Sequence, residues 1–301
     1  MRKSQATWLP IVGNCQVVRG VIKYTPVLIT EGENKGSPTV ALMKSDQMFE
    51  SGTITVRARI NDPDGKVQIG LSNGHAVEIF AGLNIGSAAY GIATYSNNQW
   101  ENFRTAAYGV APPVGRDILI KVAVAGSQIT MWVDGVEVVR GTYPVRRAQL
   151  TILLRGEKSA EAELLSVESA QNVAFVVMQF TNEFNSLYQD VITPVCRSFG
   201  FTPVRADDIY NNGLIVEDIA RSIRESALVI ADITPDNPNV YYEVGYAHGL
   251  AKPTILLAER RRESLPFDVS GFRTIFYDNT IGGKAMVEER LRKHIANVQE
   301  R

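Results

Sequence analysis

The feature that most constrains the fold of this chain is a change in hydrophobic periodicity near residue 170. Before it, short segments such as Thr53–Ile60 and Gln128–Gly135 alternate apolar and polar residues. After it, continuous apolar runs alternate with stretches of helical periodicity. A period of two fits half-buried strands and a period near 3.6 fits helices, so the two parts cannot share one layered architecture. We therefore expect two domains, residues 1–170 and 171–301, which also suits a length of 301 residues.

The first domain is predicted to be an all-β sandwich with antiparallel strands. Its alternating segments are short and are bounded by Gly, Asn, Asp or Pro, a pattern typical of antiparallel sandwiches and barrels. Asp64-Gly65, Asn73-Gly74 and Asp134-Gly135 predict two-residue hairpin turns, because Asn, Asp and Gly readily adopt the positive φ angles that such turns require.

The second domain is predicted to be an α/β doubly wound, flavodoxin-like parallel sheet of five strands. Ala174–Phe180 is a continuous apolar run, as in a strand that is covered on both faces. Apolar residues at helical spacing follow from Phe184 to Phe199, and Gly200 is expected to end that helix. Strand and helix alternate to the end of the sequence, which is the pattern of a parallel sheet.

The composition excludes several classes of protein. With 45% apolar residues the chain is not disordered, and a formal net charge of -1 does not suit a protein that coats nucleic acid. No apolar run approaches the length of a membrane span. Two cysteines and three histidines predict neither a disulfide framework nor a metal site. The N-terminal segment lacks the apolar core of a signal peptide, so we expect a cytoplasmic protein with no membrane partner.

Candidate site residues gather between Asp232 and Leu250. Ligands of doubly wound sheets bind at the carboxyl ends of the strands, and Asp232 ends an apolar run. Asn237 followed by Pro238 is a strong helix start, which places Glu243 in the second turn beside the apolar face. The alternative for Glu243 is a solvated glutamate near a helix N-terminus. The expected cluster consists of Asp232, Asn237, Asn239, Tyr242, Glu243 and Tyr246.

Other elements are expected to contribute to the same cleft. Asp218 lies on the preceding helix, where it is either a second acid of the site or a surface partner for an arginine of that helix. Asp207 follows the second strand and could hold a ribose hydroxyl or make the turn. Phe180 and Thr181 end the first strand and form the floor or rim of the cleft.

Several common catalytic motifs are absent from the sequence. It has no Gly-x-Ser-x-Gly elbow for a hydrolase triad with His248, and no phosphate-binding P-loop. No Gly-x-Gly-x-x-Gly follows the first strand of the second domain, which argues against a conventional dinucleotide oxidoreductase.

Residues 172–280 resemble the nucleoside 2-deoxyribosyltransferase-like proteins and the neighbouring TIR-like nucleotide-binding domains. The most specific part of the resemblance is NPNVYYEVGYAHGL, which begins at Asn237. The resemblance implies that Glu243 is the catalytic nucleophile and that Asp218 and Asp232 assist it. A third family aspartate is Asn237 in this sequence, which argues against the transferase reaction itself.

The resemblance also suggests a substrate and a biological setting. The TIR-like group cleaves the N-glycosidic bond of NAD through a glutamate and is widespread in bacterial antiphage defence. The first domain resembles a concanavalin A-like or laminin-G-like jelly roll, most visibly at FESGTITVRARI and ITMWVDGVEVV. Such sandwiches bind sugars, proteins or themselves, so this domain is expected to be a sensor or assembly module, and the active protein is expected to be a homo-oligomer.

We therefore expect an NAD glycohydrolase that releases nicotinamide, with NAD as substrate and no cofactor. Glu243 would stabilise or capture the oxocarbenium-like ribosyl centre. Phe180 and Tyr242 could stack on a base, and Asp207 and Asn239 could hold ribose hydroxyls. A neutral purine nucleoside would instead need a proton donor with a raised pKa, for which Asp218 and Asp232 are the candidates.

Two alternatives remain open from the sequence. The first is a nucleotide-binding switch or scaffold without turnover, in which Glu243 is a ribose ligand. The second is a nucleoside 2-deoxyribosyltransferase or a nucleotide N-glycosidase.

Overall fold

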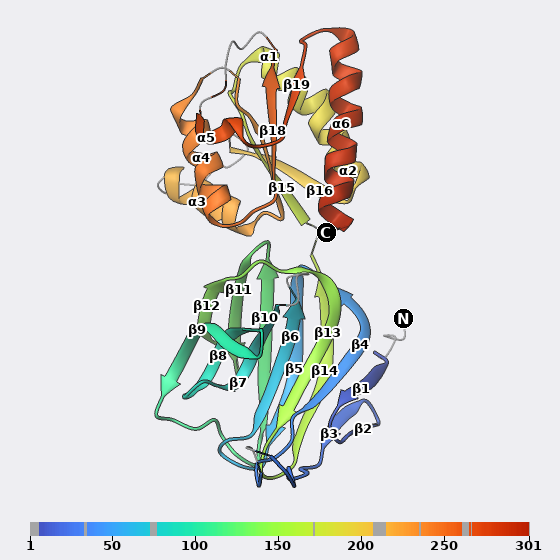
Figure 1. Ribbon diagram of the computed structural model, residues 1–301, viewed down its shortest axis with the longest axis vertical. Coiled ribbons are helices and arrows are strands. Elements are labelled where there is room, and N and C mark those ends of the chain that lie inside the picture. Colours follow the sequence, from blue (N-terminus) through green and yellow to red (C-terminus); the bar gives the residue numbers. More distant parts are fainter. Residues whose placement is uncertain are drawn as a thin grey trace. The chain divides into compact units, whose positions relative to one another are not determined.

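The computed structural model describes residues 6–300 except 33–34, 73–76, 171, 207–214, 235, 261–264 and 266. Its chain divides into two compact units (Figure 1). One unit combines Met1–Val124 with Gln128–Ala170, and the other combines Ala125–Ser127 with Gln171–Arg301. Among the described residues, no helix has both the length and the apolar character needed to span a membrane.

The first unit is a sandwich of two antiparallel seven-stranded sheets, which confirms the all-β expectation (Figure 1). In spatial order the first sheet contains β1 (Trp8–Val12), β4 (Ala41–Phe49), β13 (Arg146–Arg155), β6 (Lys66–Ser72), β7 (Glu78–Ile85), β8 (Ala88–Ser96) and β9 (Gln99–Tyr108). The second contains β12 (Val136–Thr142), β11 (Gln128–Val133), β10 (Asp117–Ala125), β5 (Gly52–Ile60), β14 (Ala160–Ser169), β3 (Val21–Tyr24) and β2 (Cys15–Val18).

Alternation along the strands separates the core of the sandwich from its outer faces. In β5, Ile54, Val56 and Ala58 are fully buried. Arg57 and Arg59, which alternate with them along the strand, are exposed. This is the period-two pattern of the sequence, and it directs every second side chain of β5 into the core between the sheets.

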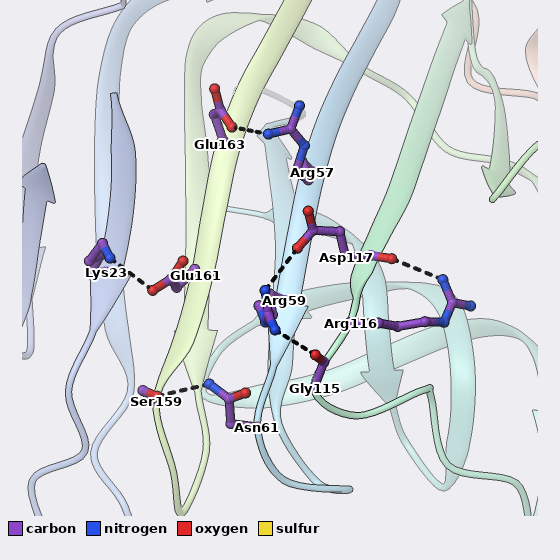
Figure 2. Close-up of polar contacts among 10 residues, drawn as sticks. All are labelled: Lys23, Arg57, Arg59, Asn61, Gly115, Arg116, Asp117, Ser159, Glu161 and Glu163. Carbon is purple, nitrogen blue, oxygen red and sulfur yellow. Dashed lines mark hydrogen bonds and ion pairs between the residues drawn. The ribbon is translucent and has the colours of Figure 1, made fainter. Parts of the chain in front are cut away.

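The outer face of the second sheet carries ion pairs between neighbouring strands (Figure 2). Lys23 and Glu161 are directly opposite each other on β3 and β14, with 3.0 Å between Nζ and Oε1. Arg57 and Glu163 are directly opposite on β5 and β14, with 2.8 Å between Nη1 and Oε2. Opposite charges in such positions stabilise strand pairing modestly.

The turn predictions have different outcomes. Asp134-Gly135 joins β11 to β12 with φ angles of 49° and 85°, so this two-residue hairpin is confirmed. The Asp64-Gly65 hairpin is wrong, because β5 and β6 belong to different sheets and residues 61–65 cross between them. A dipeptide reports local turn preference and does not specify which strands pair. Asn73-Gly74 lies outside the described residues.

The second unit contains the predicted five-stranded parallel sheet, with helices on both faces. Its strands, in spatial order, are β16 (Phe201–Arg205), β15 (Asn172–Val177), β17 (Leu228–Asp232), β18 (Thr254–Glu259) and β19 (Thr274–Tyr277). The helices are α1 (Asn182–Leu187), the π-helix η1 (Tyr188–Ile192), α2 (Thr193–Ser198), α3 (Ile215–Glu225), α4 (Pro238–Gly249), α5 (Phe267–Ser270) and α6 (Ile281–Glu300).

Consecutive residues of the central strand β17 face opposite helical layers. Leu228 and Ile230 pack with residues of α1, η1, α2 and α6. Val229 and Ala231 pack with residues of α3, α4 and α5. Because both faces are covered, β17 is a continuous apolar run rather than an alternating one.

The predicted helix between Phe184 and Phe199 is present, with one difference in its middle. The turn at η1 is π-helical, so α1 and α2 are separated by a wider turn than the sequence pattern indicates. Gly200 has a φ of 78° and directly follows the C-cap residue of α2, as predicted for a helix-terminating glycine.

Burial predicts which apolar side chains of the sandwich determine its stability. Ile54 is fully buried in β5, whereas Ile11 is 54% exposed on the edge strand β1. We expect Ile54→Ala to lower the unfolding free energy of the first unit by about 2–5 kcal/mol, because it leaves a cavity in the core. The control Ile11→Ala should change it by less than about 0.5 kcal/mol. Urea denaturation of both variants measures this, and equal effects would contradict the assigned core.

Candidate functional site

A cavity of about 720 Å³ lies at the carboxyl ends of β15, β16 and β17. The spatial order of the strands reverses here, since β16 and β17 lie on opposite sides of β15. Doubly wound sheets bind their ligands at such a switch point. The cavity is lined by Met178, Gln179, Phe180, Thr181, Ala206, Val216, Ile219, Asn237, Asn239, Val240, Tyr242 and Glu243.

Six of the ten predicted site residues meet in this cavity, although they come from different elements. Phe180 and Thr181 lie between β15 and α1, and the other four lie at the N-terminal end of α4. The side chains in question are Phe180, Thr181, Asn237, Asn239, Tyr242 and Glu243.

Asn237 and Pro238 begin α4 as the sequence predicts. The Asn237 side chain accepts a hydrogen bond of 3.0 Å from the backbone N–H of Asn239, and Pro238 occupies the first helical position. Asn satisfies a backbone donor there, and Pro loses only an N–H that would have no partner in the helix. This start places Glu243 in the second turn, beside the cavity.

Glu243 is a buried carboxyl group that has no polar partner in the part of the chain that the structure describes. It is 8% exposed, and it forms no hydrogen bond or ion pair with any residue that the structure describes. Val240 and Val244 on the same helix pack into the apolar layer between α4 and the sheet. Burial raises the pKa of Glu243 to about 7. The alternative of a solvated surface glutamate is therefore wrong.

Phe180 forms an aromatic wall of the cavity and is supported from outside it. Its side chain lines the cavity and is 55% exposed. The guanidinium carbon of buried Arg205 lies 5.3 Å from the centre of this ring and 4.6 Å from that of Tyr188. Arg205 also donates a 2.8 Å hydrogen bond to Oδ1 of Asn185. These contacts hold the cation against the ring of Phe180.

Tyr242 is a second exposed aromatic residue of the cavity and is also supported by its neighbours. Its ring, in a side chain that is 58% exposed, stacks on that of Tyr246, with 6.5 Å between centroids and 8° between planes. The hydroxyl of Tyr246 accepts a 2.7 Å hydrogen bond from Nη1 of Arg224. Tyr246, which the sequence places in the site, does not line the cavity and instead supports a residue that does.

Asp218 lies next to the cavity but does not line it. It is buried on α3 between Val216 and Ile219, both of which line the cavity. Its carboxylate forms an ion pair with Arg221. Asp218 is therefore the partner of an arginine on its own helix, as one of the two expectations has it, but it is buried rather than on the surface.

Asp232 ends β17 as expected, but the structure does not bring it to Glu243. Its carboxylate is 1% exposed and accepts hydrogen bonds from Tyr277 Oη at 2.6 Å and from the Thr234 N–H at 2.9 Å. Tyr277 belongs to the apolar layer under α6, whereas Glu243 lies on α4 on the other face of the sheet. Burial raises the pKa of Asp232 to about 7. Alternation along β17 therefore separates the two acids.

Other parts of the site differ from the sequence-based description. Asp207 lies outside the described residues. Gln179 and Arg205 were not predicted, although both stand at or just beyond the carboxyl end of a strand, which is the signal that could have identified them. Among the described residues, no three His, Cys, Asp or Glu side chains are grouped so that they could hold a metal ion.

No protein family model and no curated protein matches this sequence. Solved structures similar to it include the carbohydrate-binding module CBM66 from Bacillus subtilis, at 12% identity and a TM-score of 0.41 over 54% of this chain and 93% of the module. A β-glucanase from Bacillus licheniformis is similar at 12% identity and a TM-score of 0.40, over 55% of this chain and 91% of the glucanase. A Caenorhabditis elegans galectin is similar at 12% identity and a TM-score of 0.32, over 39% of this chain and 84% of the galectin.

These likenesses are distant and do not identify the function of this chain. The concanavalin A-like assignment of the first unit stays a prediction, as does the deoxyribosyltransferase-like and TIR-like assignment of the second.

The buried Glu243 carboxyl predicts a pH dependence of stability. Because its pKa is raised from 4.5 to about 7 on folding, the folded state binds more protons between these values, and Glu243 destabilises the protein as pH rises through them. We expect Glu243→Gln to stabilise the second unit by roughly 2–3 kcal/mol at pH 8 and by much less at pH 5.

Chemical denaturation of wild type and variant at the two pH values measures this difference. Glu217→Gln is the control, because Glu217 is exposed on α3. An equal gain from Glu243→Gln at both pH values would contradict the raised pKa.

Proposed function

We propose that this protein cleaves the N-glycosidic bond of NAD and releases nicotinamide, with Glu243 as the catalytic residue. The observation that carries the proposal is the buried, unpartnered carboxyl group of Glu243 in the wall of a cavity at the switch point of the sheet.

The electrostatics of Glu243 favour a cationic ligand. An ionised carboxylate that is buried without a counter-charge is unfavourable, and this is why its pKa is raised. A ligand that brings positive charge to the cavity relieves this cost. The nicotinamide ring of NAD is cationic, and positive charge develops at C1′ of the ribose as the bond breaks. Glu243 would therefore interact most strongly with the transition state, as catalysis requires.

The number of acids in the cavity favours NAD over a neutral nucleoside. Within the described part of the chain, Glu243 is the only acid that lines the cavity. Nicotinamide leaves with the electron pair of the C1′–N bond and needs no proton, whereas a neutral purine needs a proton donor as well. Asp218 is paired with Arg221, and Asp232 faces the other side of the sheet, so neither is placed to protonate a base in the cavity.

The hydrolytic step can be completed by the same carboxylate. Water adds its oxygen to C1′ as the bond to nicotinamide breaks, and the released proton passes to Glu243. A pKa of about 7 suits a group that accepts a proton at neutral pH and then returns it to solvent. The products are nicotinamide and ADP-ribose.

The remaining lining residues suit the other parts of such a substrate. Phe180 and Tyr242 offer exposed rings on which a planar base can stack. Gln179, Asn237 and Asn239 carry neutral amides that can hydrogen-bond ribose hydroxyls. The cavity volume of about 720 Å³ lies within the usual range for small-molecule sites.

A regulated role follows as part of the proposal. The sandwich is a separate compact unit, so it can bind a protein, a glycan or another copy of the chain while the second unit carries the chemistry. A protein with a binding unit and a separate catalytic unit suits the role of an effector of antiphage defence that is activated by a signal.

The rival function is a nucleotide-binding switch without turnover. The amides around Glu243 are compatible with this function, because they would bind ribose equally well in a complex that does not react. In that protein Glu243 would be a ribose ligand and its loss would weaken binding rather than a reaction.

Substitution of Glu243 separates these functions. We expect wild-type protein to release nicotinamide from NAD, and Glu243→Gln to reduce kcat by at least about 1,000-fold, a loss comparable to removing a principal electrostatic group. NAD binding should persist. Glu217→Gln is the matched control and should retain wild-type activity. Chromatography of the products and calorimetric titration of NAD measure the two properties.

Activity that survives in Glu243→Gln would contradict the catalytic role of Glu243. Release of a purine or pyrimidine base from nucleosides, without release of nicotinamide from NAD, would contradict the NAD proposal. It would instead support an enzyme that cleaves the N-glycosidic bond of nucleosides. Binding without turnover in wild type, tested also with activating ligands of the sandwich, would favour the switch.

The aromatic wall predicts an effect on substrate binding. Phe180→Ala should raise KM about 10- to 100-fold, because base stacking on an aromatic ring contributes about 1–3 kcal/mol. Arg205→Met should raise KM by less, since Arg205 supports the ring of Phe180 without lining the cavity itself. Phe272→Ala is the control, because Phe272 is 47% exposed in the same unit and does not line the cavity. Steady-state kinetics test this, and an unchanged KM in Phe180→Ala would exclude stacking on this residue.

A further inference from the structure

A second cavity lies wholly within the sandwich and has no part in the proposed reaction. It has a volume of about 590 Å³ and is formed by the start of β6, the end of β13, the turn between β7 and β8, and adjoining loops. Four charged side chains line it, namely Asp64, Lys66, Arg155 and Glu157.

Lys66 and Arg155 occupy an unfavourable arrangement in the free protein. They are directly opposite each other in the antiparallel pairing of β6 and β13. Directly opposite residues project from the same face of a sheet with their Cβ atoms about 4.5–5.5 Å apart, and like charges in these positions destabilise the pairing. The two cations therefore repel each other beside an open cavity.

In the other sheet of the sandwich, residues of opposite charge lie across from each other on neighbouring strands. Where Arg57 and Arg59 project from β5, the directly opposite residues on neighbouring strands are Glu163 and Asp117, and ion pairs form (Figure 2). The Lys66–Arg155 pair departs from this pattern of opposite charges.

The acids beside the two cations compensate them only in part, since the charge of Asp64 raises the pKa of Lys66 but does not outweigh burial and the charge of Arg155. Neither Lys66 nor Arg155 forms an ion pair with any described residue. Nε of Arg155 donates a 3.2 Å hydrogen bond to the Pro38 carbonyl, which fixes the guanidinium group and leaves its Nη donors for another partner. Lys66 is half-buried, and burial together with the charge of Arg155 lowers its pKa.

We propose that this cavity binds a small anion that also carries hydroxyl groups, a sugar phosphate or a sugar acid, with its anionic group between Lys66 and Arg155. An anion there would compensate both positive charges at once, and the guanidinium fork can bind a phosphate or a carboxylate through two parallel hydrogen bonds.

The remaining polar residues of the cavity explain why the ligand is expected to carry hydroxyl groups. The carboxylates of Asp64 and Glu157 only accept hydrogen bonds, so they require donors on the ligand. The amide nitrogen of Asn84 donates to the carbonyls of Pro63 and Gly65, both at 2.8 Å, which leaves its oxygen as a further acceptor. No aromatic side chain lines the cavity among the described residues, so a stacked nucleobase has no platform there.

Calorimetric titration of the full-length chain tests the proposal with three probes. Glucose 6-phosphate and glucuronate carry the two forms of the anionic group, and glucose carries neither. We expect saturable binding of at least one anion and none of glucose. Lys66→Met should weaken anion binding about 10- to 100-fold, as expected for loss of one charged hydrogen-bond donor. Arg57→Met, which removes a cation of the other sheet, should leave the affinity unchanged.

Thermal unfolding without ligand gives an independent readout. Because Lys66→Met removes the repulsion with Arg155, it should raise the melting temperature of the free first unit even as it weakens anion binding. Binding of one anion alone would identify its acid group as the one recognised. Absence of binding by both anions, equal affinity in wild type and Lys66→Met, or equal binding of glucose would overturn the proposal.

Discussion

Burial of both faces of the five-stranded sheet determines where polar groups of the second unit can lie. Within the sheet, consecutive residues of β17 pack into different apolar layers, so neither layer offers water to a charged side chain. The polar side chains of the candidate site therefore lie at the carboxyl edge, where the strands end and the helices begin. Asp232 and Glu243 both lie near that edge, but alternation and helix placement direct them to opposite faces. The cavity consequently contains Glu243 but not Asp232, so this pair supplies one acid rather than two to any reaction there.

Features that arise from a few adjacent residues could be predicted from the sequence. The two hydrophobic periods indicated the sandwich and the parallel sheet, and Asn237 with Pro238 indicated the start of α4, which places Glu243 at the cavity. Properties that depend on pairing across the chain could not be predicted in this way. The environment of Asp232, for example, depends on Tyr277, which lies 45 residues later.

The charges at both cavities are arranged differently from those on the outer face of the second sheet. On the outer face of the second sheet, cations and acids alternate across strands and compensate each other. At the cavity of the sandwich, Lys66 and Arg155 lie directly opposite each other, and at the cavity of the second unit, Glu243 has no counter-charge among the described residues. Charge that is not fully compensated lowers stability, so its presence at these two cavities is the arrangement expected where a site serves binding rather than folding.

The start of α4 has a consequence for the conformational entropy that is lost when a ligand binds. Pro238 restricts its own φ angle, and the Asn237 cap closes the first turn without help from any ligand. The backbone that carries Asn239, Tyr242 and Glu243 is therefore ordered before a substrate arrives. Little conformational entropy remains to be lost when a ligand associates with this wall, so more of the interaction energy with Glu243 and the exposed ring of Tyr242 is retained as affinity.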